Sequence, residues 1–290
     1  MKIDRLVVIG VGLIGGSVAR ALRRARWVEH ITGVGRGREN LDRARELGII
    51  DDWTHDVGEA VRTADMVLIA VPMGAYASVF AAMADNISSH VPVTDAGSTK
   101  QHALREARRW LPYPERFVPA HPIAGTERSG AEASFAELFE DRWCILTPEA
   151  DTDPHARNVV EAMWRATGSR VIHMDAAEHD DCLAAVSHLP HVAAYALVNA
   201  VCKSGGADPF RFAAGGFRDF TRIASSSPEM WRDIVLANRD AVLRKLDAFR
   251  DELASIAHAI ETGDAEGLAQ MFAQAKHARD AWLETHGGRL

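Results

Sequence analysis

The sequence predicts an α/β protein in which a parallel-sheet domain, residues 1–175, is followed by an all-α domain, residues 176–290. Two observations support this organisation. In the first half, short runs rich in Val, Ile and Leu alternate with helical stretches, which is typical of a parallel sheet with helices on its faces. After about Asp175, strand-like runs stop, and Ala, Leu, Glu, Arg and Asp recur at helical spacing to the end.

The predicted strands are mostly continuous apolar runs, as expected when helices cover both faces of a sheet. Ligands of such sheets bind beyond the carboxyl ends of the strands, so the loops at that edge are candidate functional segments. The predicted strands are Leu6–Ile9, Ile31–Val34, Met66–Val71, Val91–Thr94, Phe117–Ala120, Trp143–Thr147 and Arg170–His173.

Three long helices are predicted in the second half. Their apolar stripes need a partner, and we expect a second copy of the chain, giving a homodimer through this half. Ser227 suits a helix N-cap, and Pro228 suits the first helical turn. The predicted helices are Ala177–Lys203, Pro228–Thr262 and Ala265–Thr285.

Composition narrows the class of protein. The 290 residues are 47% hydrophobic and 25% charged, as in ordinary globular proteins, and the net charge of -7 argues against a nucleic-acid partner. Cys144, Cys182 and Cys202 are widely spaced and odd in number, so neither a disulfide framework nor a zinc site is predicted. The chain opens on a predicted strand, and its run Val192–Val201 has half of the ~20 residues that a membrane span needs. We therefore expect a cytoplasmic protein without membrane contact.

A glycine-rich segment, Gly10–Ser17, follows the first predicted strand and opens a helical pattern. This placement favours a dinucleotide site over a merely structural turn, because Gly10 permits a tight turn, Gly12 lets the backbone approach a pyrophosphate, and Gly15 allows close packing of helix on strand. The expected cofactor-binding residues of the segment are Gly10, Gly12, Leu13, Ile14 and Gly15.

The choice of cofactor is predicted from the next turn. An NAD site usually carries Asp or Glu about 20 residues after the fingerprint, but this chain has Gly35-Arg36-Gly37-Arg38. Arg36 or Arg38 could pair with the 2′-phosphate of NADP, although solvated loop arginines are the ordinary alternative. The sequence therefore favours NADP and leaves NAD open.

Polar residues follow two neighbouring predicted strands. His121 directly follows the Phe117–Ala120 run, and Ser98 follows the Val91–Thr94 run. Oxidising an alcohol needs a base for the hydroxyl proton, and a neutral His suits that task near pH 7. We expect His121 to be the base and Ser98 to share the hydrogen bond to the hydroxyl, whereas a lone strand-end His would more often be structural.

Two segments of the helical half carry candidate substrate contacts. In Ser187-His188-Leu189-Pro190-His191, the proline predicts a local irregularity, and the histidines three residues apart could share a face. A metal site there is not expected, because no third ligand has recognisable spacing. Between helices, Gly215–Ala224 holds Arg218 and Arg222, whose guanidinium groups suit a carboxylate or, alternatively, an interhelical ion pair.

Taken together, these motifs resemble the prephenate/arogenate (cyclohexadienyl) dehydrogenase family over nearly the whole chain. The motifs are GVGLIGGS at Gly10–Ser17, DAGSTK at Asp95–Lys100, HPIAGTE at His121–Glu127, SHLPH at Ser187–His191, GFRDFTRIA at Gly216–Ala224, and the following Met230-Trp231-Arg232-Asp233.

The resemblance implies a Rossmann-type domain followed by a helical dimerisation domain, and oxidative decarboxylation of prephenate or arogenate in tyrosine biosynthesis. It implies that His121 accepts the ring hydroxyl proton with help from Ser98, and that Arg222 holds the ring carboxylate. The remaining contacts that it implies are His188 or His191 near the substrate side chain, with Trp231 and Arg218 lining the same pocket.

Two alternatives stay open at this point. A β-hydroxyacid or imine reductase of similar build would usually use a Lys in the helical half, and Lys203 lacks a motif around it. A non-catalytic redox sensor that binds NADP would keep the glycine segment but would leave His121, Ser98 and Arg222 without a role.

Overall fold

The computed structural model describes residues 2–126, 128–203, 205 and 208–286. Its main sheet has six strands in the order β3-β2-β1-β4-β5-β6, and every neighbouring pair is parallel. This confirms the predicted α/β class. The strands are β1 (Ile3–Ile9), β2 (Val28–Val34), β3 (Asp52–Thr54), β4 (Met66–Ile69), β5 (Val93–Asp95) and β6 (Phe117–Val118).

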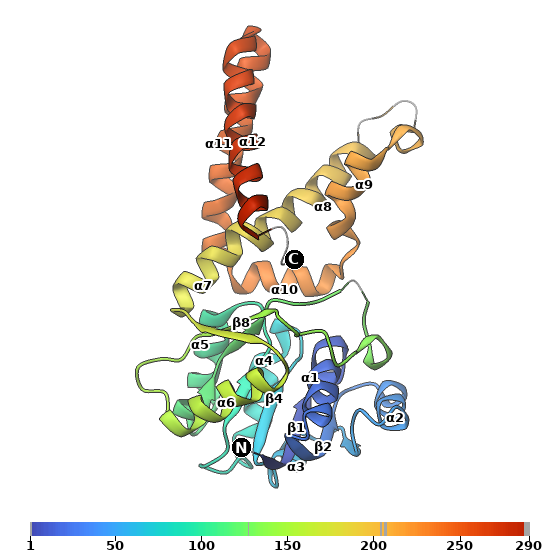
Figure 1. Ribbon diagram of the computed structural model, residues 1–290, viewed down its shortest axis with the longest axis vertical. Helices are drawn as coiled ribbons and strands as arrows, with labels where there is room; N and C mark the ends of the chain where they lie inside the picture. Colours follow the sequence, from blue (N-terminus) through green and yellow to red (C-terminus); the bar gives the residue numbers. More distant parts are fainter. Residues whose placement is uncertain (1, 127, 204, 206–207, 287–290) are drawn as a thin grey trace. The chain divides into compact units, whose positions relative to one another are not determined.

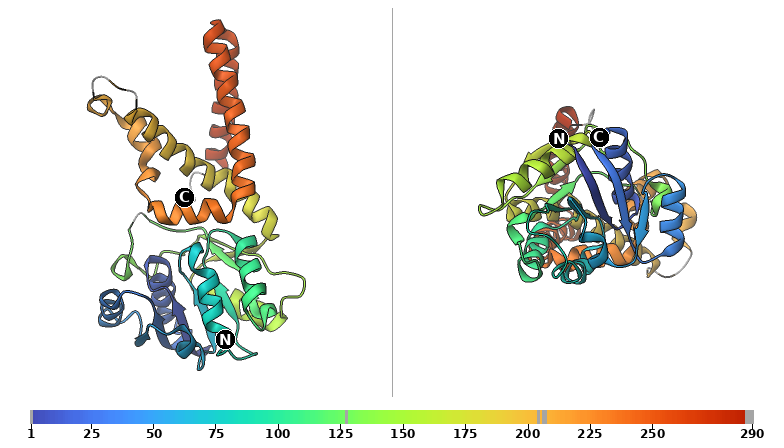
Figure 2. Two further views of the ribbon diagram at one scale, coloured as in Figure 1. Left: turned by 180° about the vertical axis from the view of Figure 1, so that it is seen from behind. Right: turned by 90° about the horizontal axis from the view of Figure 1, so that it is seen from below.

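Helices cover both faces of this sheet (Figures 1 and 2). In β1, Leu6 and Val8 belong to one core cluster, whereas Val7 and Ile9 belong to the other. Both sets of alternating side chains are therefore buried, which explains the continuous apolar strand runs. The first cluster contains residues of α1 (Leu13–Arg24), α2 (Arg38–Glu46) and α6 (Pro154–Ala166), and the second contains residues of α3 (Val57–Val61), α4 (Tyr76–Met83) and α5 (Lys100–Trp110).

A second sheet of three strands corrects the strand predictions. The predicted strand Phe117–Ala120 is wrong as one element, because β6 ends at Val118 and β7 (Ala120–Pro122) joins the other sheet. Pro119 between them cannot donate a ladder hydrogen bond. In this sheet β7 pairs antiparallel with β8 (Trp143–Leu146), which pairs parallel with β9 (Arg170–His173). The short polar strand β3 lacked an apolar run and was not predicted.

A long helical stretch follows β9. It consists of α7 (Ala176–Leu183), a five-residue π-helix η4 (Ala184–His188) and α8 (Leu189–Cys202). The irregularity expected near Pro190 is confirmed, and it precedes the proline. Pro190 itself lies in the first turn of α8, where a missing N–H is tolerated.

The predicted single helix Pro228–Thr262 is wrong. Helix α10 (Pro228–Ala237) ends at Asn238, whose φ of -109° and ψ of 32° are not helical, and α11 (Arg239–Thr262) begins at the next residue. The Ser227 cap is confirmed, because its hydroxyl accepts the Met230 N–H. The segment expected between helices is itself helical, as α9 (Gly215–Thr221) and the 3-10 turn η6 (Arg222–Ser225).

The chain divides into two compact units, one up to Arg239 and one from Asp240 onward. The first unit contains both sheets and the helices up to α10. The second contains most of α11 and α12 (Ala265–His286). The functional boundary near residue 175 stays a prediction.

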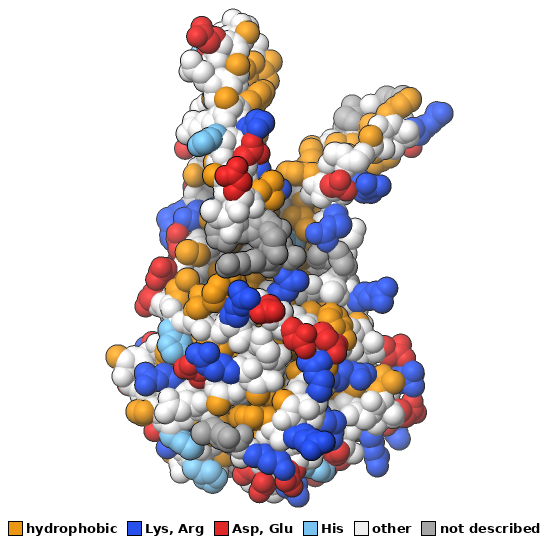
Figure 3. Space-filling model, viewed as in Figure 1, with side chains coloured by type: hydrophobic (Ala, Val, Ile, Leu, Met, Phe, Trp, Pro, Cys, Tyr) orange, Lys and Arg blue, Asp and Glu red, His pale blue; other side chains and the backbone are white. Residues whose placement is uncertain are grey.

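The helical stretch Ala176–Cys202 exposes much of its apolar surface. Val186 is 74% exposed, and Figure 3 shows hydrophobic side chains along the arm that α8 and α9 form. This helical stretch of 27 residues contains a window of 18 residues with a mean hydropathy of 1.2, so by length and composition alone it is long and apolar enough to cross a membrane. An apolar face of this kind is also what a protein partner would cover.

Candidate active site

The glycine segment forms a tight turn between β1 and α1. Gly10 has φ of 101°, and a Cβ there would lie 2.3 Å from the carbonyl oxygen of Ala70. A Cβ on Gly15 would lie 2.2 Å from the carbonyl oxygen of Gly10, whereas one on Gly12 would meet no atom within 4 Å. Gly10 and Gly15 are thus required by the fold, and Gly12 leaves space for a ligand to approach the backbone.

A cleft of about 1030 Å³ lies beside this turn. Gly10, Gly12 and Arg36 line it, and Arg36 has no hydrogen bond or ion pair with the rest of the described chain. Leu13, Ile14, Gly15 and Arg38 are not part of the lining. Arg38 instead pairs with Asp42 at 3.3 Å and lies over the Trp53 ring. The structure thus places Arg36, rather than Arg38, at the cleft.

Helix α10 also lines the cleft, through Glu229, Arg232 and Asp233. Asp233 packs against Gly74, where a Cβ would lie 2.6 Å from its Oδ2. Trp231, on the same helix, is buried against His188 of η4 and His191 of α8. This helix therefore connects the cleft to a cluster of imidazoles, although neither His121 nor Arg222 lines the cleft itself.

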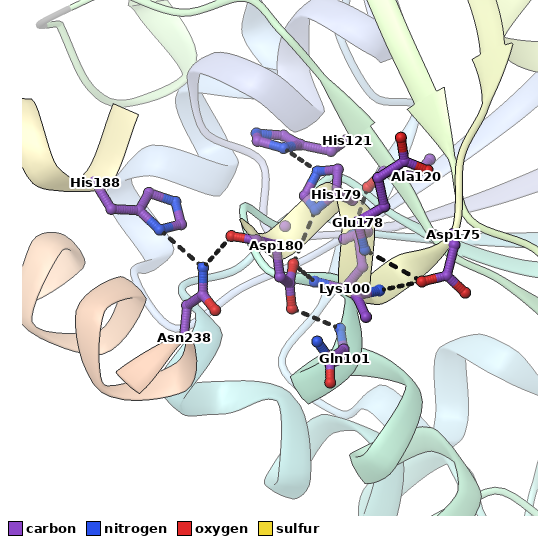
Figure 4. Close-up of polar contacts among 12 residues, drawn as sticks. Lys100, Gln101, Ala120, His121, Asp175, Glu178, His179, Asp180, His188 and Asn238 are labelled. Carbon is purple, nitrogen blue, oxygen red and sulfur yellow. Dashed lines mark hydrogen bonds and ion pairs between the residues drawn. The ribbon is translucent and has the colours of Figure 1, made fainter. Parts of the chain in front are cut away.

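His121 lies on β7, opposite Ile145 of β8. Its Nδ1 is 2.9 Å from Nε2 of His179, and Nδ1 of His179 is 2.8 Å from Oδ1 of Asp180 (Figure 4). His179 and Asp180, both on α7, are buried. The proposed base thus stands at the end of a His–His–Asp chain of hydrogen bonds.

Asp180 is held by the start of α5. Its carboxylate accepts the backbone N–H groups of Lys100 at 2.7 Å and Gln101 at 3.0 Å. The first N–H groups of a helix lack partners within the helix, and Thr99 at the N-cap makes no side-chain cap there. Asp180 therefore serves as the cap and is fixed in turn.

A buried ion pair lies beneath His121. Lys100 Nζ is 2.6 Å from Asp95 Oδ2 and donates to the carbonyl oxygen of Ala120 at 2.6 Å. Asp95 also accepts from the Tyr76 hydroxyl and the Ala120 N–H. Both charged side chains are fully buried, and such a pair is tolerated when hydrogen bonds satisfy its remaining atoms. The pair anchors both backbone groups of the residue before His121.

The helical segments contribute a second group of side chains. The His191 ring stacks on Trp231 with centroids 3.5 Å apart, and the His188 ring meets Trp231 edge-on at 6.0 Å. Arg222 begins η6, which packs against α8; burial lowers the pKa of His191, and the positive charge of Arg222 lowers it further. His188 contacts Asn238, whose amide also contacts Asp180, next to the His179 partner of His121. The structure thus brings His121, His188, His191, Trp231 and Arg222 into one region.

Two further residues that were predicted for the site, Ser98 and Arg218, have no described contact with these side chains. Ser98 is half-buried after β5. The Arg218 side chain is 80% exposed and pairs with its neighbour Asp219. Glu127, the last residue of the HPIAGTE motif, lies outside the described residues.

The histidines of this region favour their neutral forms. Burial lowers the pKa of His121 well below its usual value, and nearby His179, Lys100 and His188 lower it further. Burial also lowers the pKa of His188, to about 4. A neutral imidazole can accept a proton, so His121 is suited to act as a base at neutral pH. Across the described chain, no group of three or more His, Cys, Asp or Glu side chains could hold a metal ion.

Comparison with known proteins identifies the family of the chain. Residues 18–173 match the prephenate dehydrogenase nucleotide-binding domain, and residues 175–274 match the prephenate dehydrogenase dimerization domain. The chain belongs to the prephenate dehydrogenase family. It is therefore an NAD(P)-dependent dehydrogenase, and the reductase and redox-sensor alternatives are not favoured.

Similar proteins cover almost the whole chain. A cyclohexadienyl dehydrogenase of Zymomonas mobilis is 40% identical, covering 97% of each chain. A Bacillus subtilis prephenate dehydrogenase is 39% identical over 96% of this chain and 76% of its own. The crystal structure of A. aeolicus prephenate dehydrogenase with hydroxyphenyl propionate and NAD+ has a TM-score of 0.91 at 34% identity, covering 97% of this chain and 99% of that one.

Sequence reasoning did not identify four residues that support the candidate site: His179, Asp180, Lys100 and Asn238. Lys100 stood within a recognised motif but had no assigned role. The other three lie among ordinary helical residues, and only the tertiary structure shows that they face the histidines. Both His179 and Asp180 are buried in the structure, but a polar pair near a helix start gives no sign of this in the sequence.

Proposed function

We propose that this chain oxidises and decarboxylates prephenate, arogenate or both, transferring hydride to NAD(P)+ on the way to tyrosine. The observation that carries the proposal is the His121–His179–Asp180 chain of hydrogen bonds, which ends in the same region as His188, His191 and Arg222. A base and a cation near each other suit a substrate that carries a hydroxyl group and carboxylates.

The cofactor fits the cleft beside the glycine turn. Gly12 leaves its Cβ position open, and the N-terminus of α1 supplies unpaired N–H groups for a pyrophosphate. Gly10 and Gly15 would shape the turn, and Leu13 and Ile14 would begin the helix that faces the anion. Bound there, the nicotinamide would supply the hydride acceptor.

His121 would take the proton of the ring hydroxyl at its Nε2, while Ser98 would share the hydrogen bond that positions this hydroxyl. The lowered pKa of His121 keeps its imidazole ready to accept that proton. Loss of the hydride and of the hydroxyl proton leaves a ring ketone whose two C=C bonds reach the neighbours of the carboxylate-bearing carbon. The electron pair of the breaking bond to carbon dioxide can therefore move through them to the ketone oxygen as the ring becomes aromatic. The protein's part in that step is to hold the ring.

Arg222 would hold the ring carboxylate, since a guanidinium can offset the cost of removing this group from water. His188 or His191 would contact the substrate side chain, and Trp231 would close the pocket behind both imidazoles. Arg218 would reach the pocket only by leaving its contact with Asp219. The choice between prephenate and arogenate depends on contacts to the substrate's keto or amino group.

NADP is the proposed preference over NAD. Arg36 lines the cleft, has no other partner in the described chain, and no carboxylate lines the cleft on the same turn. It is therefore available to pair with a 2′-phosphate. Arg38, which is engaged with Asp42, would be a secondary contact.

A homodimer formed by residues 176–290 is proposed as the working assembly, with 1–175 as the cofactor domain. The exposed apolar side chains of the α8–α9 arm support it, because a partner would remove them from water. A cytoplasmic location, without nucleic-acid or membrane partners, is proposed with it.

The deciding experiment measures the absorbance of reduced nicotinamide with each substrate and each cofactor in turn. Turnover of prephenate or arogenate is the expected result, with a lower KM for NADP than for NAD. A protein that binds the cofactor but oxidises neither compound would contradict the proposed reaction.

A further inference from the structure

One path of hydrogen bonds links the two imidazoles His121 and His188. It runs from His121 to His179 and on to the carboxylate of Asp180, and from the backbone carbonyl of Asp180 through Asn238 to His188 (Figure 4). His179, Asp180, His188 and Asn238 are all buried, so water does not compete for these contacts. Each donor and acceptor along the path is therefore set by its neighbours.

At the His121 end, the direction follows from Asp180. A carboxylate can only accept, and this one already accepts two backbone N–H groups, so Nδ1 of His179 must donate to it. Burial lowers the pKa of His179, which keeps that ring neutral with one N–H. Its Nε2 must then accept, Nδ1 of His121 must donate, and Nε2 of His121 carries a lone pair.

At the His188 end, the direction follows from the main chain. Nδ2 of Asn238 donates to the carbonyl oxygen of Asp180 at 2.7 Å, which identifies that end of the amide as the NH2 group. The same NH2 group is 3.1 Å from Nδ1 of His188, so this nitrogen accepts. A neutral His188 then carries its proton on Nε2. That atom is buried and has no hydrogen-bond partner among the described residues.

We infer that His179, Asp180 and Asn238 are positioning residues that fix opposite tautomers on the two imidazoles, so that His121 presents a bare Nε2 and His188 presents an Nε2–H donor. The tautomers are properties of the free protein, whereas their catalytic meaning rests on the proposed function. In that reaction the substrate O–H bond breaks as the His121 Nε2–H bond forms, and Asp180 stabilises the resulting imidazolium through His179. The N–H of His188 is left for an oxygen atom of the substrate.

Nitrogen NMR of the ring atoms tests the inference without substrate. In full-length protein labelled with 15N-histidine, the two ring nitrogens of each neutral tautomer have distinct shifts, and His121→Asn and His188→Asn identify the two signals. We expect the Nδ1–H form for His121 and the Nε2–H form for His188. Either ring in the opposite form would overturn the inference, even if the protein turns over prephenate.

Matched variants test the positioning roles. His179→Gln keeps an acceptor near the position of Nε2, whereas His179→Phe keeps the ring shape without one. We expect Phe to disturb the His121 tautomer and lower kcat by about 10²-fold, and Gln to keep the tautomer and lose about tenfold or less. Unchanged tautomer and kcat in a folded Phe variant would contradict the role of His179.

Asn238→Asp should reverse the tautomer of His188. A carboxylate there can only accept, so His188 would move its proton to Nδ1 and present a lone pair instead of a donor. We expect the His188 signal to switch form and KM to rise by about tenfold, with thermal unfolding followed as the control for folding. An unchanged His188 tautomer would show that Asn238 does not set it. If the wild-type protein has the expected tautomers but turns over neither substrate, the proposed function is contradicted and the inference on the tautomers stands.

Discussion

Nδ1 of His121 lies 2.9 Å from Nε2 of His179, which is 58 residues further along the chain and on a different element. The contact joins β7 of the small sheet to α7. It leaves the opposite nitrogen of His121 to act on a ligand, and it places the negative charge of Asp180 one imidazole away. This geometry gives the base its orientation before any substrate is present.

Replacing His121 with Asn should remove the base while leaving the fold and the cofactor cleft intact. We expect kcat to fall by about 10²–10⁴-fold. Affinity for NADP should stay unchanged, because His121 does not line the cleft. Steady-state kinetics with fluorescence titration of the cofactor would check this. A variant that lost only thermal stability would show that His121 is structural.

The glycine turn offers a matched pair of substitutions. Gly12→Ala should fold normally, because its new Cβ meets no atom within 4 Å, but it should weaken cofactor binding by about tenfold or more where the pyrophosphate must approach the backbone. Gly15→Ala should instead lower the free energy of unfolding by about 1–3 kcal/mol or more, since its Cβ would lie 2.2 Å from the Gly10 oxygen. Urea denaturation and cofactor titration of both variants would separate the two effects.

The sequence predicted those elements of the fold that depend on neighbouring residues alone. The buried strands of the main sheet are continuous apolar runs, and the Ser227 cap depends on adjacent residues alone. The break at Asn238 was missed, because helical periodicity continues through it, and the cause is tertiary. Its side chain is occupied by Asp180 and His188, which are 58 and 50 residues away.

The same holds for the candidate site, of which only the residues at strand ends could be predicted from the sequence. His121 and the glycine segment stand at strand ends, where sequence order alone points to a ligand. His179 and Asp180 offered no such signal, because their role depends on where α7 packs against the start of α5. The different surroundings of Arg36 and Arg38 likewise follow from the way α2 leaves the turn, which the sequence does not specify.

Arg36→Ala should change cofactor preference rather than catalysis. Removing a guanidinium that pairs with the 2′-phosphate should raise KM for NADP by about tenfold or more, a typical loss for a hydrogen bond to a charged group. KM for NAD should stay the same. Arg45→Ala is the matched control, because Arg45 is exposed on α2 and does not line the cleft. An NADP preference that survives in Arg36→Ala would exclude Arg36 from 2′-phosphate recognition.

Arg222→Ala should chiefly raise KM for the substrate, by about 10- to 100-fold, because a carboxylate contact made before the transition state is lost. kcat should change little. The pKa of His191 should rise in the same variant, since the Arg222 charge contributes to lowering it. Kinetics together with histidine NMR titration would test both. A fall in kcat at constant KM would place Arg222 in the chemical step instead of in binding.

Protonation of His188 should make the fold sensitive to acid. Burial lowers its pKa in the folded protein to about 4, whereas in the unfolded chain it stays near the ordinary value for histidine. Between these two values the unfolded state binds more protons, so the free energy of unfolding falls as pH falls, by up to about 3 kcal/mol from this residue. His121, His179 and His191, whose pKa values are also lowered, should add to the same trend.

His188→Gln should therefore lose less stability than the wild type between pH 6.5 and 4 in urea denaturation at fixed protein concentration. His90→Gln, at an exposed position, should lose as much as the wild type, and equal losses in all three proteins would show that His188 does not carry the effect.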